Sequence, residues 1–229
     1  MPGTLSIKLF FEMTQRLINF IFIISLLIGC TPNDNERISK FENHLGIDKA
    51  EVLTEIVETF DSLLHSEFDC KSNYDCYILF LESVENQDDI SFITNLPESK
   101  RLELKTKIVN TGLRKTIFEY EFEVRQDTSN IIQEIFRADC PDSLKNEHIA
   151  NSDSVVNFKI FGNYVTGLEL VQENDSALIN YVDAIIATGG MSYSLLSSGL
   201  LYAHEHYGFS EYFLKRIVVT EFFLLYLNK

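Results

Sequence analysis

Residues 212–227 (YFLKRIVVTEFFLLYL) form the stretch that decides the fold, because they are apolar almost all round when drawn as a helix. A surface helix of a globular protein carries one apolar stripe and one polar face. The only charged residues here are Lys215, Arg216 and Glu221. We therefore predict that this helix is a central packing element with other helices around it. A tail anchor in a membrane is the alternative, but the charges and the chain end leave the apolar run short for that role.

Segments upstream have the periodicity of amphipathic helices. In residues 49–68 the apolar side chains recur at i, i+3, i+4 and i+7, and glutamates occupy the opposite side. Asp48 and Glu51 have the spacing of a capping box at the start of this helix. Helix-start and helix-stop residues predict further helices over residues 74–85, 97–110, 175–187, 192–207 and 210–229.

Two stretches favour β-strands. Residues 118–125 (FEYEFEVR) alternate strictly between apolar and charged side chains. In residues 155–171, Gly162 and Asn163 separate two apolar runs as a hairpin turn does, although a helix that ends near Gly162 and a second that starts near Asn163 fit equally well. The predicted fold class is mainly α: a helical bundle-like domain over residues 37–229, with at most a small β-hairpin or a few short strands.

The N-terminus has the layout of a secretory signal peptide. Arg16 precedes the apolar run 17–28 (LINFIFIISLLI). A helix of this length rises about 18 Å, which is well short of the roughly 30 Å of hydrocarbon in a bilayer. A start at Met13 rather than Met1 gives the more usual layout, and both starts leave the same mature chain.

The apolar run ends in Leu27-Ile28-Gly29-Cys30, which resembles the lipobox of bacterial lipoproteins. The resemblance covers the first 30 residues. It implies that the Cys30 thiol receives a diacylglycerol, that the bond between Gly29 and Cys30 is cleaved, and that the new amino group is acylated. Residues 1–29 are then the signal peptide, and residues 30–36 are the lipidated cysteine and a polar tether. A buried core helix that happens to end in Gly-Cys is the alternative.

The residues after Cys30 indicate a destination. Thr31 follows the cysteine in place of Asp, which by similarity to the lipoprotein sorting rule implies the outer membrane. Asp34 and Glu36 are a thin match to a surface-export signal, and they do not decide between the periplasmic face and the cell surface. The C-terminal third is loosely similar to helical lipoproteins with no assigned activity, and that likeness implies no residue role.

The chain is strongly acidic, with a formal net charge of −15. Such a surface repels phosphate backbones and anionic headgroups, so nucleic acid is not an expected partner. The expected partners are a membrane, through the N-terminal lipid, and a protein of the cell envelope. No Gly-rich phosphate loop or dinucleotide fingerprint is present, so no cofactor is expected.

Cysteines and histidines offer few ligand patterns. Cys70 and Cys76 flank a short polar loop and have a spacing that closes a small disulfide in an oxidising compartment, which leaves Cys140 as the odd cysteine. Five residues separate the loop cysteines and no histidine pair has finger spacing, so no metal is expected. His204 and His206 lie about 200° apart around a helix and cannot chelate one ion together.

Catalytic motifs are equally sparse. The segment from Gly190 to Ser194 (GMSYS) resembles a nucleophile elbow, but it lacks the final glycine and a preceding strand. We therefore interpret Ser192 or Ser194 as the cap of a helix. Asp88-Asp89 is interpreted in the same way, as the start of a helix.

The leading hypothesis is a lipid-anchored envelope lipoprotein whose mature domain is a binding or interaction module rather than an enzyme. A hydrolase is the first alternative, and it requires Ser192 or Ser194 within hydrogen-bond reach of His204 or His206. A structural subunit of an envelope assembly is the second, and it predicts a contiguous exposed apolar patch.

Overall fold

The computed structural model describes residues 34–120 and 155–227. The chain divides into two compact units, residues 1–37 and residues 38–229, and the packing described below is that of the second unit. The described residues are mostly helical and contain one two-stranded sheet. The fold class is therefore mainly α, as the sequence predicts.

Most predicted helices are present, with ends that differ from the prediction by at most two residues. The helices before the sheet are α2 (Asp34–Leu45), α3 (Ile47–Glu67), α4 (Asn73–Glu85), the short 3₁₀ helix η1 (Ser91–Asn95), α5 (Glu98–Thr111) and α6 (Leu113–Ile117). Those after it are α9 (Asn163–Val171), α10 (Ser176–Thr188), α11 (Tyr193–Tyr207), α12 (Glu211–Val218), the π-helical turn η3 (Val219–Phe223) and α13 (Leu224–Leu227).

Local signals explain several helix ends. The Asp175 side chain accepts a 3.0 Å hydrogen bond from the backbone N–H of Leu178 and so caps α10. Gly112 ends α5 with φ of 69°, a left-handed conformation that suits glycine. The predicted capping box of Asp48 and Glu51 is wrong. The helix α3 begins two residues earlier than predicted, after Gly46 at φ 98°, and no side chain caps it.

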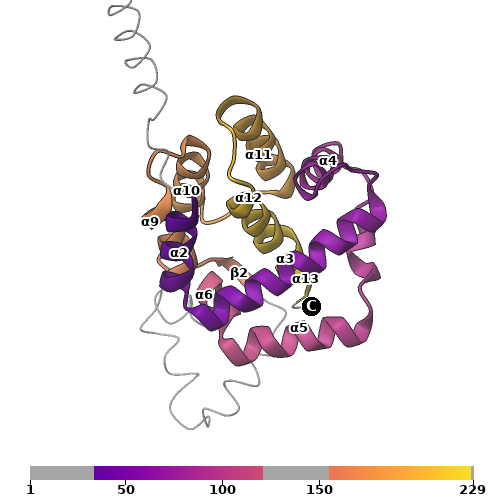
Figure 1. Ribbon diagram of the computed structural model, residues 1–229, viewed down its shortest axis with the longest axis horizontal. Coiled ribbons are helices and arrows are strands. Elements are labelled where there is room, and N and C mark those ends of the chain that lie inside the picture. Colours follow the sequence, from indigo (N-terminus) through magenta and orange to yellow (C-terminus); the bar gives the residue numbers. More distant parts are fainter. Residues whose placement is uncertain (1–33, 121–154, 228–229) are drawn as a thin grey trace, which may run out of the picture. The chain divides into compact units, whose positions relative to one another are not determined.

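The segment α12–η3–α13 is the centre of the unit. Every residue from 213 to 224 is buried, and the segment packs against α3 and α4 (Figure 1). Aromatic rings connect it to its neighbours: Phe223 stacks on Phe60 of α3 with ring centroids 4.9 Å apart, and Phe222 meets Phe80 of α4 edge-on at 5.3 Å. The prediction of a central helix is confirmed.

Helix α3 is the longest element, and α5 runs beside it (Figure 1). Helix α11 packs against α4 and α10, and α9 packs against α6 and α10. Gly167 lets α9 approach α2 closely, because a Cβ there would lie 3.2 Å from the Phe41 ring. His44 of α2 is hydrogen-bonded to Thr166 of α9 at 2.9 Å, so polar and apolar contacts hold the same pair of helices together.

The strands correct one prediction. β1 (Phe118–Tyr120) pairs antiparallel with β2 (Val155–Phe158), with Phe118 opposite Phe158. The hairpin proposed around Gly162 and Asn163 is wrong. Of the alternative pair of helices, the one that starts at Asn163 is present, whereas residues 155–158 form a strand and not a helix. Gly162 precedes α9 where the backbone passes close to α6, because a Cβ at this position would lie 2.5 Å from the carbonyl oxygen of Thr116. Residues 121–125 of the longer predicted strand lie outside the described residues.

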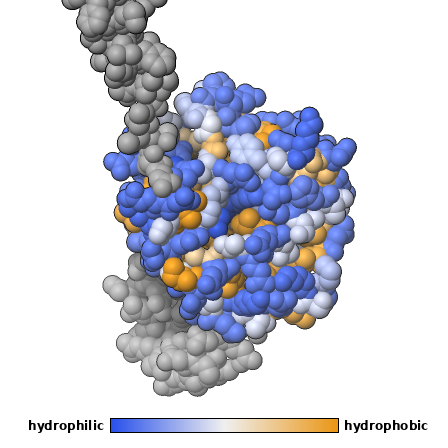
Figure 2. All heavy atoms as spheres, viewed as in Figure 1, coloured by the Kyte–Doolittle hydropathy of each residue, from blue (hydrophilic) through white to orange (hydrophobic). Residues whose placement is uncertain are grey.

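Helix α2 includes three residues that the sequence analysis assigned to a tether. These residues, Asp34 to Glu36, form the first turn of α2, where two acidic side chains suit the positive end of the helix dipole. No helix in residues 34–120 or 155–227 is both long and apolar enough to cross a membrane. Hydrophilic side chains cover most of the visible surface, and hydrophobic residues form separate patches between them (Figure 2).

Candidate functional site

The connection between α3 and α4 holds the cysteine pair that the sequence singles out. Cys70 and Cys76 are joined as a disulfide, with their Cα atoms 5.3 Å apart. Cys70 follows the end of α3, whereas Cys76 lies in the first turn of α4. Ser72 caps α4 between them, because its hydroxyl accepts a 3.1 Å hydrogen bond from the backbone N–H of Asp75. The disulfide therefore closes a short loop against two rigid helices.

His65, in the last turn of α3, completes this cluster. Its Nδ1 lies 3.4 Å from the sulfur of Cys70 and 3.5 Å from that of Cys76. Within the described part of the chain, these three residues are the group whose potential ligand atoms all lie within 4.8 Å of one another. Reasoning from the sequence missed His65 because it compared histidines only with zinc-finger spacing. The sequence signal that could have identified His65 is its short separation from Cys70. The chain turns back after the end of α3, and this turn places Cys70 beside the last turn of that helix.

A chain of hydrogen bonds orients the His65 ring from its other side. His65 Nε2 and the Asn73 side-chain oxygen are 2.5 Å apart, and the Asn73 amide donates to Oδ2 of Asp61 at 2.8 Å. Asp61 also binds the ammonium of Lys215 at 3.1 Å. Lys215 belongs to the central helix, so the disulfide loop is connected by polar contacts to the core of the unit.

The C-terminal end of α11 lies next to the same loop. The Tyr74 hydroxyl and His204 Nδ1 are 2.8 Å apart, and this contact joins α4 to α11. His206 points elsewhere: its ring stacks on Tyr202 with centroids 4.0 Å apart, and its Nδ1 donates to the Tyr202 carbonyl. Tyr207 lies beside both rings. The two histidines therefore have separate surroundings, as their angular separation on a helix predicts.

The structure does not assemble the serine–histidine pair that a hydrolase needs. Ser192 caps the start of α11, where its hydroxyl accepts a hydrogen bond from the backbone N–H of Leu195. His204 lies twelve residues after Ser192 and ten after Ser194 along α11, rises of about 18 and 15 Å, and His206 lies farther still. The bond of His204 to Tyr74 also directs its ring toward α4 rather than toward the serine. The geometry therefore gives the hydrolase alternative no support.

The central helix carries a second polar cluster, inside the core. Glu221 is 4% exposed, and the Tyr181 hydroxyl of α10 donates a 2.7 Å hydrogen bond to its carboxyl group. Burial raises the pKa of Glu221 to about 7, and the hydrogen bond from Tyr181 partly opposes that rise. Glu221 lies in the π-helical turn η3, a rare type of turn that often marks functional sites.

Arg216 is another buried charge of this helix. Its guanidinium lies 3.3 Å from the centroid of the Tyr212 ring and donates to the Thr54 hydroxyl at 2.8 Å. Tyr212 in turn donates to the carboxylate of Glu42 at 2.7 Å. Burial lowers the pKa of Arg216, and the neighbouring Tyr212 and Glu42 oppose that effect. These contacts bind α2, α3 and α12 together around one charge.

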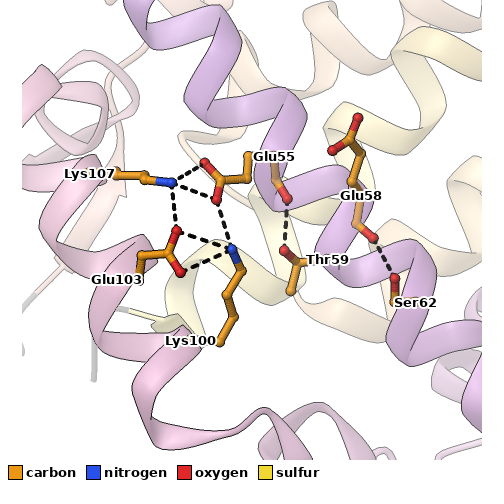
Figure 3. Close-up of polar contacts among 7 residues, drawn as sticks. All are labelled: Glu55, Glu58, Thr59, Ser62, Lys100, Glu103 and Lys107. Carbon is orange, nitrogen blue, oxygen red and sulfur yellow. Dashed lines mark hydrogen bonds and ion pairs between the residues drawn. The ribbon is translucent and has the colours of Figure 1, made fainter.

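An ion-pair network joins α3 to α5 (Figure 3). Glu55 of α3 binds Lys100 and Lys107 of α5, each with an N–O distance of 2.8 Å, and Glu103 bridges the same two lysines. Hydrogen bonds from Lys100 and then from Lys107 lower the pKa of Glu55. All four charges are used within the network, so its role is to position helices.

The remaining predicted positions have simpler outcomes. The lipidation and cleavage residues Cys30 and Gly29, and also Cys140, lie outside the described residues. Asp89 accepts hydrogen bonds from the backbone N–H and the hydroxyl of Ser91 and so lies just before the 3₁₀ helix η1, whose N-cap position is Ile90. The described residues thus form a mainly α unit with a disulfide-closed loop between α3 and α4. No family model, curated protein or solved structure matches the chain.

Proposed function

We propose that this chain is an exported lipoprotein, anchored to the outer membrane by acyl groups on Cys30, whose helical domain is a binding or interaction module of the cell envelope. The motif Leu27-Ile28-Gly29-Cys30 behind an apolar run carries the proposal. Two or three acyl chains hold a protein on a membrane almost irreversibly, because each buried methylene contributes about 0.8 kcal/mol.

The disulfide supports the assignment to an exported compartment. Disulfides form and persist where the surroundings are oxidising, as in the bacterial periplasm and at the cell surface, and are rare in the cytosol. The bond between Cys70 and Cys76 lies in the helical domain, so it is an observation independent of the signal sequence. The N-terminal motif and the disulfide of the helical domain therefore both favour export from the cytosol.

The surface of α11 supports binding over catalysis. Leu195 and Tyr202 are 60% and 53% exposed, and seven residues separate them, so they lie on one face of the helix. His206 and Tyr207 extend this face at the C-terminal end. Exposed aromatic side chains are enriched where proteins bind partners. The same face also favours the second alternative, a subunit of an envelope assembly.

The test is the intact mass and membrane partition of the full chain expressed in a Gram-negative host, beside the variant Cys30→Ala. We expect the wild type in the membrane fraction, at the mass of a chain that begins at Cys30 plus acyl groups. The variant should lack the acyl groups and should not be cleaved before residue 30. Cys140→Ala is the matched control and should behave as the wild type. An unmodified wild type that still contains residues 17–29 would overturn the proposal.

A further inference from the structure

We propose that His65, Cys70 and Cys76 form a metal site, selective for a borderline-soft divalent cation such as Zn²⁺, when the disulfide between the cysteines is reduced. The inference goes beyond the lipoprotein proposal and does not depend on the lipid anchor. It rests on the orientation of His65, on the distances within the cluster, and on the types of donor atom that meet there.

The orientation of His65 follows from its hydrogen-bond partners. Because the Asn73 amide nitrogen donates to the carboxylate of Asp61, the Asn73 oxygen faces His65 and accepts a hydrogen bond from Nε2–H. In the neutral ring, Nδ1 then carries the lone pair, and this is the atom that faces both sulfurs. Metal-binding histidines are held in the same way, by a hydrogen bond from the nitrogen that does not bind the metal.

The distances suit tetrahedral zinc. Zn–S bonds of about 2.3 Å and Zn–N bonds of about 2.0 Å at tetrahedral angles place sulfur and nitrogen roughly 3.5 Å apart. Nδ1 of His65 already lies 3.4 Å from one sulfur and 3.5 Å from the other. Only the two sulfurs must separate, to about 3.8 Å. Side-chain rotation achieves this, because the Cα atoms are 5.3 Å apart and need not move far.

The donor set indicates which metal binds. Two thiolates and one imidazole favour zinc over magnesium or calcium, which prefer oxygen ligands. The three protein ligands leave a fourth position for water. The sequence argument against a metal compared the two cysteines with zinc-finger spacing, and it did not include a ligand from the end of α3.

Reduction is the step that exposes the site. A dithiol reductant transfers two electrons and two protons, which breaks the sulfur–sulfur bond, yields the thiols of Cys70 and Cys76, and leaves the reductant as its own disulfide. Cys70 is partly exposed and Cys76 is buried, so the sulfur of Cys70 is the accessible one. Zn²⁺ then displaces one proton from each thiol and binds two thiolates and the neutral imidazole.

The experiment uses Co²⁺ as a spectroscopic substitute for Zn²⁺. The full chain carries Cys30→Ser and Cys140→Ser, so that only the loop thiols remain, and is titrated in detergent under anaerobic conditions after reduction with a phosphine. We expect one Co²⁺ per chain, with thiolate-to-metal charge-transfer absorption and tetrahedral ligand-field bands that Zn²⁺ abolishes. The oxidised chain should show neither signal. The proposal would be overturned if the oxidised chain bound Co²⁺ as tightly as the reduced chain. It would also be overturned if the reduced chain bound Co²⁺ without the charge-transfer band.

Variants separate the ligands from their surroundings. His65→Ala should weaken binding at least tenfold, whereas His206→Ala changes another exposed histidine that belongs to no such cluster among the described residues and should leave binding unchanged. Asn73→Ala keeps all three ligands but removes the group that orients His65, so it should weaken binding roughly 10- to 100-fold. Circular dichroism verifies that each variant keeps its helices. If His65→Ala binds as tightly as His206→Ala, the site is not the one proposed. These outcomes are independent of whether Cys30 is lipidated.

Discussion

The Tyr181 hydroxyl on α10 donates a 2.7 Å hydrogen bond to Oε1 of Glu221, in the π-helical turn of the central helix. Both residues are buried. The bond satisfies a carboxyl group that the apolar core would otherwise leave without a partner, and such unpaired groups are costly. It also ties α10 to the centre of the unit. Because burial disfavours the charged form of Glu221 and the hydrogen bond from Tyr181 only partly offsets this, stability depends on pH.

Stability should fall as the pH rises from about 4.5 to 7. The pKa of Glu221 is about 7 in the folded chain against an ordinary value of 4.5, so the folded state binds this proton more tightly. The contribution is fully present below pH 4.5 and is lost as the pH passes the folded value, about 3 kcal/mol in all. Glu221→Gln keeps the shape and cannot ionise, so urea denaturation at pH 8 should show it to be more stable than the wild type.

The exposed glutamate of α9 provides the control for that measurement. Glu169→Gln removes one negative charge from the surface and leaves Glu221 in place. Comparing the two variants at each pH from 5 to 8 cancels the effect of the acidic surface. If both variants show the same pH dependence of the unfolding free energy, Glu221 does not have the raised pKa.

Removing the Thr54 hydroxyl should destabilise the fold through Arg216. Arg216 is 4% exposed and its guanidinium donates to Thr54 at 2.8 Å, so Thr54→Val leaves a buried charged donor without this acceptor. We expect a loss of about 1–3 kcal/mol in the free energy of unfolding. Thr59→Val is the matched control on α3, because the Thr59 hydroxyl only donates to a carbonyl of its own helix. Equal losses would contradict the role of Arg216.

Glu55→Gln should loosen the contact between α3 and α5. Glu55 is the partner of both lysines in Figure 3, and its side chain is 27% exposed against 47% for Glu103. We expect a loss of about 1 kcal/mol at low salt, a smaller loss at high salt, and a lesser effect for Glu103→Gln. Because the pKa of Glu55 is lowered, its contribution is present above the unfolded pKa and is lost as the pH falls through the folded value. Salt-independent losses would argue against an ionic cause.

Breaking the disulfide should cost about 2 kcal/mol, because it closes a short loop with a sequence separation of 6. Cys70→Ala and Cys76→Ala should lose equal stability, and the double variant should lose no more than either, since each removes the same bond. Denaturation under non-reducing conditions measures the three values. Alkylation followed by mass measurement provides the independent check: both cysteines should react only after reduction. If either one reacts before reduction, the bond is absent.

Local patterns in the sequence were sufficient for much of the architecture. Helix positions follow from apolar periodicity and from end signals such as Asp175 and Gly112, because these act within a few residues of the chain. The burial of residues 213–224 follows for the same reason, since a helix that is apolar almost all round must be covered. The pairing of Cys70 with Cys76 was also predictable, because both cysteines lie in one short loop.

Tertiary packing alone decided which groups meet across the chain. The sequence marks Lys215, Arg216 and Glu221 only as interruptions of an apolar helix, whereas the fold gives each a partner from another element. The sequence patterns likewise did not predict that β1 pairs with β2, or that His65 lies beside the disulfide. A hydrogen bond between distant residues leaves no periodic trace in the sequence, because its geometry is set by how helices pack and not by local spacing. The sequence by itself therefore determined the helices, the central segment and the proposed anchor, and the fold determined the polar centres.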